Sequence, residues 1–479
     1  MSSFDNSMQT FESYLDIGYD QKYRPQFHFT SRKNWLNDPN GMVHYDGEYH
    51  LFFQHNPQGT PWGNMTWGHA VSTDMVRWTQ LPHAILPYDE GTIFSGTALV
   101  DHDNTLGKQP VRQGSPRQSS GQAGQAGDVK TLVAFFTFAK YPYGQSIACS
   151  TDKGRTFTLL NDGKCVVPNQ GLIDSDRDPK VFWHAPTKKW VMVLYVQTGI
   201  ARIFTSENMQ DWTLASDINR EGFHECPDFV ELPVLDADGT PTGETRWLLY
   251  DARFECSIGS FDGASFSIEE TFSKSDLGPS FYAAQTFSNS PDGRTVIIGW
   301  MRESNFVEQD MPFNQQMSFP CTLELRQDRE GIRLCRQPIR EIETLYKATH
   351  AFEAVTADAL APQLADIDAE LLDLSIAFAP GQDLALNMRG IDITYDGKAN
   401  TFNSESCKPL PAHPVDGNIA LRALVDRGSI ELFANEGSAV ATSYVLPAPE
   451  NTSIQLSGDA DIRSLTVHEL ESSWGGAEG

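Results

Sequence analysis

A short apolar segment rich in β-branched and aromatic residues recurs five times in the first two thirds of the chain. A second pattern, a polar turn leading to an aromatic residue and then Thr or Ser, ends at Trp78, Phe157, Trp212 and Phe266, at intervals of 79, 55 and 54 residues. A repeat of that length with three or four short strands is typical of a propeller blade. The apolar segments are Tyr49–Phe53, Thr131–Phe138, Trp190–Val196, Trp247–Tyr250 and Thr295–Trp300.

The longer first interval contains Gly114–Asp128, a low-complexity stretch of Gln, Gly and Ser that we interpret as a surface loop insertion. Discounting about 24 residues around this stretch restores the period. A plain β-sandwich would also contain many strands, but it would not repeat their internal order. The sequence therefore predicts an all-β chain whose residues 25–337 form a five-bladed β-propeller.

The composition changes after Gln337. The segment Ile339–Lys347 is typical of a short helix, and Ala351–Glu370 is rich in Ala and Asp. Alternating strands with turns roughly every 8 to 12 residues follow, which favours a β-sandwich. The predicted division is an N-terminal extension over residues 1–24, the propeller over 25–337, a linker with a short helix over 338–365, a β-sandwich over 366–472 and a disordered tail over 473–479.

The net charge of −27 disfavours nucleic acid and anionic membranes as partners, because both repel an acidic protein. No apolar run approaches the roughly 20 residues that span a bilayer. The seven cysteines are scattered without zinc spacing, so we expect reduced, mostly buried thiols and neither a metal site nor a cofactor. The N-terminus lacks a secretory signal, which predicts an intracellular protein, or a secreted one whose signal peptide has been removed. The oligomeric state stays open.

Three acidic residues occupy comparable places in three of the repeated units. Asp38 lies 11 residues before the first apolar segment, Asp178 lies 12 before the third, and Glu225 lies 22 before the fourth. A proline follows each acid, directly or after one residue. The first strands of propeller blades line a central channel, so we expect the three acids to meet there. Each acid taken alone could also be a turn residue or one half of a surface ion pair.

Converging carboxylates repel one another, so a fold keeps them together only with compensation or for a chemical task. Glycoside cleavage suits two of them, because one attacks as a carboxylate while the other donates a proton. We expect Asp38 and Asp178 to keep Glu225 protonated near neutral pH. Sugars also need aromatic faces and neutral hydrogen-bonding partners. The candidates are Asn37, Gln54, Trp62, Phe94, Ser95, Tyr282 and Trp300.

The motifs WLNDPNG, FFQHNP, WGHA, FSGTALVD, RDPKVFW, ECPDF and FYAAQTF, in this order, resemble those of glycoside hydrolase family 32. The family contains invertases, levanases and exo-inulinases, and Val425–Pro447 resembles its C-terminal sandwich. The resemblance implies a five-bladed propeller with an appended sandwich and retaining hydrolysis of a small or polymeric β-fructofuranoside.

The resemblance also implies roles for particular residues. Asp38 matches the nucleophile, Glu225 the acid/base and Asp178 the residue that stabilises the transition state. Asp176 departs from the family, which often has an aromatic residue at this position. The positions that match fructosyl-binding residues are Asn37, Gln54, Trp62, Phe94, Ser95 and Arg177.

Several alternatives stay open. The same scaffold could transfer fructosyl units to another sugar instead of water. A related five-bladed family cleaves arabinans and xylans with inversion, and a lectin-like propeller would bind carbohydrate without turnover. The sequence does not distinguish sucrose, inulin and levan as substrates, or exo from endo action.

Overall fold

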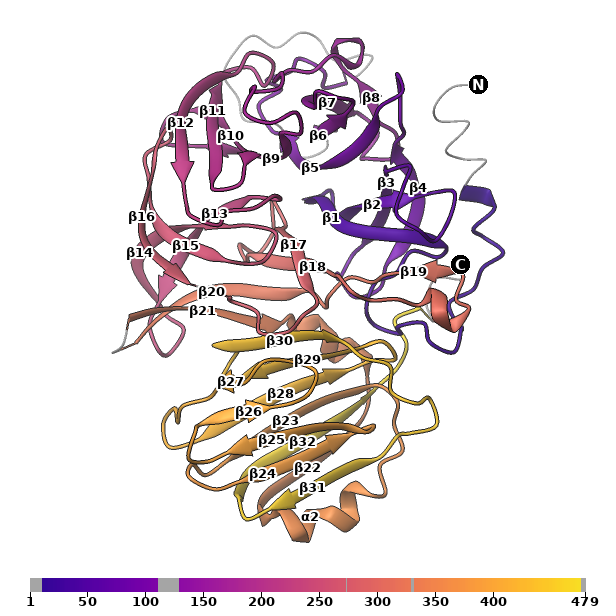
Figure 1. Ribbon diagram of the computed structural model, residues 1–479, viewed down its shortest axis with the longest axis vertical. Coiled ribbons are helices and arrows are strands. Elements are labelled where there is room, and N and C mark those ends of the chain that lie inside the picture. The colour runs from indigo at the N-terminus through magenta and orange to yellow at the C-terminus, as the bar shows by residue number, and fades with distance from the viewer. Residues whose placement is uncertain (1–10, 111–128, 273, 329–330, 475–479) are drawn as a thin grey trace.

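The computed structural model describes residues 11–110, 129–272, 274–328 and 331–474, and nearly all of its regular structure is β-strand. Figure 1 shows two bodies, an N-terminal one whose sheets surround a common centre and a C-terminal one of stacked sheets. The all-β prediction is confirmed, whereas the predicted loop insertion at Gly114–Asp128 lies outside the described residues. Within the described ranges, no helix is long and apolar enough to cross a membrane.

The N-terminal body consists of sheets that follow one another along the chain and are antiparallel except for the β1–β19 and β13–β20 pairs. Each predicted apolar segment lies in the second strand of its sheet or unit, where burial on both faces explains the continuous run of apolar residues. The last unit pairs in one sheet with its predecessor through β20, and β19 returns to pair with β1. The strands are β1 (Asn34–Tyr45), β2 (Glu48–Asn56), β3 (Thr66–Ser72), β4 (Thr79–Ile85), β5 (Thr92–Asp101), β6 (Thr131–Ala139), β7 (Gly144–Ser150), β8 (Thr158–Leu159), β9 (Arg177–His184), β10 (Lys189–Gln197), β11 (Ile200–Ser206), β12 (Thr213–Asn219), β13 (Asp228–Leu235), β14 (Pro241–Tyr250), β15 (Cys256–Phe261), β16 (Phe266–Phe272), β17 (Phe281–Thr286), β18 (Val296–Met301), β19 (Phe313–Asn314), β20 (Cys321–Asp328) and β21 (Gly331–Pro338), with 3₁₀ turns η1 (Asn161–Gly163) and η2 (Val307–Gln309).

Strands β1, β5, β9, β13 and β17 face the centre of this body (Figure 1). Buried polar contacts connect these strands to one another. Lys180 Nζ lies 2.8 Å from Asp228 Oδ1, and the Thr286 backbone N–H donates to Asp228 Oδ2 at 2.8 Å. The Thr97 hydroxyl donates to the Pro179 carbonyl at 2.6 Å. These buried bonds link neighbouring inner strands to one another.

The C-terminal body contains two antiparallel sheets, which confirms a β-sandwich-like unit, but its predicted start at residue 366 is wrong. Tyr346–Thr356 is a strand that pairs with Asp461–Leu470 along its length, so it belongs to the sandwich and not to a linker. Its partner lies more than a hundred residues away in sequence, which local composition cannot reveal. The helix predicted over Ile339–Lys347 is a 3₁₀ segment, and a short α-helix follows the strand. The elements are η3 (Arg340–Leu345), β22 (Tyr346–Thr356), α2 (Ala357–Leu364), β23 (Leu372–Phe378), β24 (Leu384–Met388), β25 (Ile391–Asp396), β26 (Thr401–Asn403), β27 (Leu410–Pro411), β28 (Ile419–Val425), β29 (Ser429–Ala434), β30 (Ala439–Tyr444), β31 (Ile454–Gly458) and β32 (Asp461–Leu470).

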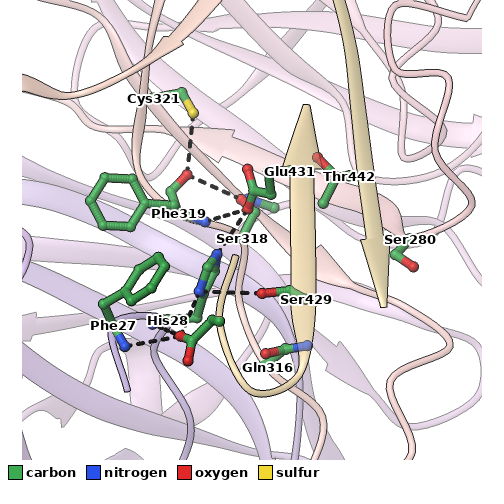
Figure 2. Close-up of polar contacts among 12 residues, drawn as sticks. Phe27, His28, Ser280, Gln316, Ser318, Phe319, Cys321, Ser429, Glu431 and Thr442 are labelled. Carbon is green, nitrogen blue, oxygen red and sulfur yellow. Dashed lines mark hydrogen bonds and ion pairs between the residues drawn. The ribbon is translucent and has the colours of Figure 1, made fainter. Parts of the chain in front are cut away.

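A buried histidine joins the two bodies (Figure 2). The His28 ring lies between Asp426 and Glu431, with Nδ1 at 2.9 Å from Asp426 Oδ2 and Nε2 at 3.1 Å from Glu431 Oε1. Glu431 Oε1 also accepts a 2.8 Å bond from the Phe319 backbone N–H. Burial opposes a charge on His28, but the hydrogen bonds and charges of the two acids outweigh burial and raise its pKa to about 9. The interface therefore holds a buried imidazolium between two carboxylates.

The end of the chain returns to the N-terminal segment. The Trp474 ring stacks on Tyr19 at a centroid distance of 4.0 Å, and its Nε1 donates to the Pro25 carbonyl at 2.8 Å. The Ser473 backbone N–H donates to the Gln26 carbonyl at 2.8 Å. The predicted disorder of residues 473–479 is therefore wrong for the first two, because a buried, stacked tryptophan gains more from packing than it loses in freedom. Residues 475–479 lie outside the described ranges.

All seven cysteines fall within the described residues and none of them forms a disulfide. Five are buried and two are partly buried, so the prediction of reduced, mostly buried thiols is confirmed.

Candidate active site

A cavity of about 180 Å³ opens at the end of the N-terminal body where the inner strands begin. Asp38 comes from β1, Asp178 from β9, and Glu225 from the segment before β13. The predicted convergence of three sequence-distant acids is therefore confirmed. Every residue predicted for the site lines the cavity, and Met65 is the single lining residue that the sequence did not suggest. The lining consists of Asn37, Asp38, Gln54, Trp62, Met65, Phe94, Ser95, Arg177, Asp178, Glu225, Tyr282 and Trp300.

Irregularities in strand pairing aim these side chains into the cavity. The β1–β2 register shifts between Leu36 and Pro39, which spans Asn37 and Asp38, and the β5–β6 register shifts between Ile93 and Gly96, which spans Phe94 and Ser95. Strand β9 skips a pairing at Asp178, and β17 skips one just after Tyr282. A bulge bends its strand and redirects a side chain. The inner strands therefore depart from regular pairing at or beside the residues that line the cavity.

Asp38 is held by short hydrogen bonds. The Ser95 hydroxyl donates to its Oδ2 at 2.6 Å, and the Asn37 amide donates to its Oδ1 at 3.1 Å. Asn37 is in turn oriented by Trp35 Nε1, which donates to its Oδ1 at 2.8 Å. Burial raises the pKa of Asp38, the bond from Ser95 opposes this, and the charge of Glu225 adds to it. The result is a fixed carboxylate whose orientation does not depend on a ligand.

The Glu225 carboxylate accepts three hydrogen bonds in this structure. Arg177 donates to Oε2 through Nη2 at 2.7 Å and Nε at 2.9 Å, and the Tyr282 hydroxyl donates to Oε1 at 2.9 Å. Burial would raise the pKa of Glu225, but the charge and hydrogen bonds of Arg177, followed by the bond from Tyr282, lower it. The expectation that Glu225 is protonated in the free site is therefore wrong. The sequence placed Arg177 near the site but not against this carboxylate.

Asp178, and not Glu225, is the acid whose pKa is raised toward neutral pH. Burial raises the pKa of Asp178 to about 7, Arg177 opposes this, and the charges of Glu225 and Asp38 add to it. Its Oδ2 accepts the Cys226 backbone N–H at 3.0 Å. Asp178 and Cys226 both have left-handed backbone angles, with φ of 66° and 53°. Such angles cost free energy in residues other than glycine and are concentrated at functional sites.

Cys226 is a contributor that sequence reasoning missed. Its Sγ lies 3.3 Å from Asp178 Oδ2 and 3.6 Å from Asp38 Oδ2, so one thiol lies between two of the acids. Burial, followed by the charges of Asp178 and Asp38, raises its pKa well above the ordinary value, so it is a neutral donor. Its place directly after Glu225 in the ECPDF motif was the available signal.

Asn40 is a second residue that supports the site from behind. Its amide lies 3.0 Å from Gln54 Nε2 and 3.2 Å from Ser95 Oγ, with its oxygen facing Gln54 and its nitrogen facing Ser95. It therefore links two of the predicted sugar partners.

Aromatic residues form two walls of the cavity. On one side the Trp62 ring, which is 57% exposed, meets Phe94 edge-on at 6.0 Å. On the other side Trp300 meets Tyr282 edge-on at 5.9 Å, and Trp300 Nε1 donates to Gln315 at 2.9 Å. Aromatic faces flanking polar and charged groups suit a sugar, whose C–H faces are apolar and whose hydroxyls need partners.

Asp176, the residue that departs from the family pattern, is buried and lies behind the cavity. One of its oxygens accepts the Gln170 backbone N–H. Burial raises its pKa to about 6, and Arg202 and Arg177 oppose that shift. A backbone donor therefore satisfies one oxygen of this acid, whereas its Oδ1 is buried without a hydrogen-bond partner.

A nearly all-β scaffold with three acids in a sugar-sized cavity defines a glycoside hydrolase. Residues 28–338 match the family model described as "Glycosyl hydrolases family 32 N-terminal domain", and residues 386–469 match "Glycosyl hydrolases family 32 C terminal". The chain belongs to glycosyl hydrolase family 32, as the sequence motifs indicate.

Characterised relatives align over nearly the whole chain. A levanase of Bacillus subtilis is 37% identical over 95% of this chain and 72% of its own length. An extracellular exo-inulinase of Aspergillus niger is 32% identical, with 96% of each chain covered. The crystal structure of an exo-inulinase from Aspergillus awamori superposes with a TM-score of 0.82 at 26% identity, over 95% of this chain and 100% of that one. The sandwich therefore belongs to the shared architecture along with the catalytic body.

Proposed function

We propose that this protein is a retaining β-fructosidase that releases terminal β-D-fructofuranosyl units from fructans and from sucrose. The observation that carries the proposal is the meeting of Asp38, Asp178 and Glu225 in one cavity between aromatic walls. The names of the aligned relatives, levanase and exo-inulinase, supply the fructan as the substrate class.

The sheet order supports a catalytic body of five blades. Strands β1–β4, β5–β8 and β9–β12 are consecutive antiparallel units, and β13–β16 continue the series. Strands β17, β18, β20 and β21 make a fifth unit, which pairs with the fourth through β20. On this interpretation β19, returning to pair with β1, fastens the last unit to the first.

The proposed reaction is a double displacement. Asp38 attacks the anomeric C2 of the terminal fructosyl unit while Glu225 gives a proton to the departing glycosidic oxygen. The C2–O bond to the leaving group breaks as the bond to Asp38 forms, which gives a covalent fructosyl-enzyme. Glu225, now ionised, takes a proton from water, and the resulting hydroxide attacks C2 and frees Asp38. Asp178 accepts hydrogen bonds from fructose hydroxyls as positive charge develops on the ring.

Glu225 gains its proton only when substrate is bound, because Arg177 and Tyr282 keep its pKa low in the free site. A bound sugar excludes water from the cavity, and this added burial raises the pKa of Glu225. Fructose hydroxyls that donate to Asp178 favour its ionised form, and its proton, held with a pKa of about 7, becomes available to the site. The three acids thus act as one coupled set.

The size of the cavity favours attack at a chain end. About 180 Å³ suits a single sugar ring, so one terminal unit fits beside the acids. A fructan therefore presents its terminal unit to the acids while the rest of the chain stays outside.

A time course on sucrose, inulin and levan tests the proposal, with ¹H NMR of the first-formed fructose. The expected result is free fructose as the sole early product, in the β configuration. Early oligosaccharides would indicate endo action or transfer, and an inverted product would overturn the covalent intermediate. Binding of fructan without turnover would support the lectin alternative.

A further inference from the structure

A row of aromatic rings extends from the cavity to residues outside its lining. Trp62 meets Phe94 at 6.0 Å, Phe94 meets Tyr143 edge-on at 5.5 Å, and Tyr143 meets Tyr141 at 4.6 Å. The first two residues line the cavity, whereas the two tyrosines lie beyond it in the turn between β6 and β7. The row is therefore continuous with the site but extends past the space for one sugar.

Tyr141 is 72% exposed, the highest exposure among the large apolar side chains of the described residues that stand out to solvent. Most such rings are buried at least in part, and an exposed one beside a binding site marks a contact surface. Tyr141 contacts the buried Tyr143, yet most of its side chain stays exposed to solvent.

The turn that carries Tyr141 is held in place. The Tyr143 backbone N–H donates to the Asp174 carbonyl at 2.9 Å. On the other side Lys140 Nζ donates to the Asp89 carbonyl at 2.8 Å and lies 4.0 Å from Glu90. The ring therefore stands on a braced support, which lowers the entropic cost of binding.

The surroundings suit a neutral polyhydroxyl chain. The cation of Lys140 is paired with Glu90, and the protein carries a net charge of −27, which repels anionic polymers. A fructosyl ring offers C–H faces for stacking, and its hydroxyls keep their bonds to water at such an exposed position.

We propose that Tyr141, supported by Tyr143, is a stacking platform for fructosyl units of a fructan chain behind the unit being cleaved. This inference rests on the proposed function, and it identifies a residue that favours longer substrates over shorter ones. A disaccharide fills the cavity and the space next to it, and it does not extend to a ring two aromatic contacts away from Phe94. Only longer substrates gain from the platform.

The test compares kcat/KM on sucrose with kcat/KM on inulin and levan for wild type, Tyr141→Ala and Tyr141→Phe. Loss of a stacking partner is expected to lower the ratio of polymer to sucrose activity roughly three- to tenfold for Tyr141→Ala. Tyr141→Phe keeps the ring and is expected to keep the ratio. The matched control is Trp183→Ala, which removes an aromatic residue of 40% exposure near the far end of β9.

An unchanged ratio in Tyr141→Ala, or an equal loss on all three substrates, would overturn the platform. A loss in Tyr141→Phe as large as in Tyr141→Ala would assign the effect to the hydroxyl and also overturn stacking. Failure of wild type to hydrolyse any of the three substrates would instead overturn the proposed function, so the two failures are distinguishable.

Discussion

Arg177 and Glu225 form a two-pronged ion pair inside the cavity, with Nη2 and Nε of the guanidinium at 2.7 and 2.9 Å from the same carboxylate oxygen. The two residues come from neighbouring units of the chain and lie 48 residues apart. Arg177 also stands beside Asp178, with 3.8 Å between Nε and Oδ2. One cation therefore lowers the pKa of both acids.

Removal of this cation should move the pH profile. In Arg177→Gln the pKa of Glu225 is expected to rise, because the largest opposing influence to burial is gone. An acid with a higher pKa stays protonated to higher pH, so the alkaline limb of kcat/KM should move upward by about one pH unit or more, along with a loss of overall activity. Arg155→Gln, which breaks an exposed pair with Glu48, is the control and should leave the profile unchanged. A downward shift of the alkaline limb in Arg177→Gln would contradict this assignment.

The roles of the two catalytic acids can be separated by the leaving group. Asp38→Asn should lose about 10⁴-fold or more in kcat on every fructoside, since no nucleophile remains. Glu225→Ala should recover formation of the intermediate with a fructoside whose leaving group needs no proton, while hydrolysis of the intermediate stays slow. The measurement is a burst of leaving group followed by slow turnover. An Asp38→Asn variant that retains more than a few per cent of activity would refute the nucleophile assignment.

Asp178 should lower the stability of the fold at alkaline pH. Its pKa is about 7 in the folded protein, so its contribution to stability is fully present below the ordinary value near 4 and is lost as pH rises through 7. Asp178→Asn should therefore be more stable than wild type at pH 8, by roughly 2–4 kcal/mol, and should lose that advantage near pH 4. Thermal unfolding at both pH values measures the difference, with the surface variant Asp217→Asn as a control. Equal or lower stability of Asp178→Asn at pH 8 would count against this pKa.

The sequence alone predicts the parts of the site that short motifs encode. Asp38, Asp178 and Glu225 could be placed together because each precedes an apolar strand at a similar spacing and is followed by proline. The orientation of Arg177 could not be predicted, because it depends on a bulge in β9 and on the position of another strand. For the same reason the direction of the shift in the Glu225 pKa could not be predicted. Cys226 was missed since a lone thiol carries no spacing pattern.

The same distinction applies to the fold. The recurring strands could be predicted from the sequence because burial on both faces gives continuous apolar runs. Strand β22 could not be predicted, because its pairing partner β32 is remote in sequence and its own composition is ordinary. Trp474 was assigned to a disordered tail because its partners, Tyr19 and Pro25, lie at the other end of the chain.

The charged histidine at the interface should make the fold less stable at alkaline pH. Because the pKa of His28 is raised to about 9, its contribution is present below pH 6.5 and is lost as pH rises through 9. His28→Gln should lower the free energy of unfolding by about 3 kcal/mol at pH 6, with the gap closing toward pH 10. Melting temperatures from pH 6 to pH 10 test this, and His350→Gln, at a partly exposed pair with Glu469, is the control. A gap independent of pH would show that His28 is not charged.

The terminal tryptophan should contribute as a core residue does. Trp474→Ala removes a stacked, hydrogen-bonded ring and should cost about 3 kcal/mol of unfolding free energy. Trp474→Phe keeps most of the stacking and should cost less. Denaturant titration measures both values, and two variants that match wild type would mean that the ring adds nothing.

The stacking of Trp474 on Tyr19 has a topological consequence, because it brings the first and last described parts of the chain to one place. A linker that joined the Tyr19 segment to Trp474 would close the described chain into a ring. The resulting cyclic polypeptide would have fewer unfolded conformations, while its catalytic cavity, built from the inner strands, would be untouched. New termini could then be opened in a surface loop, so this fold is a natural subject for circular permutation.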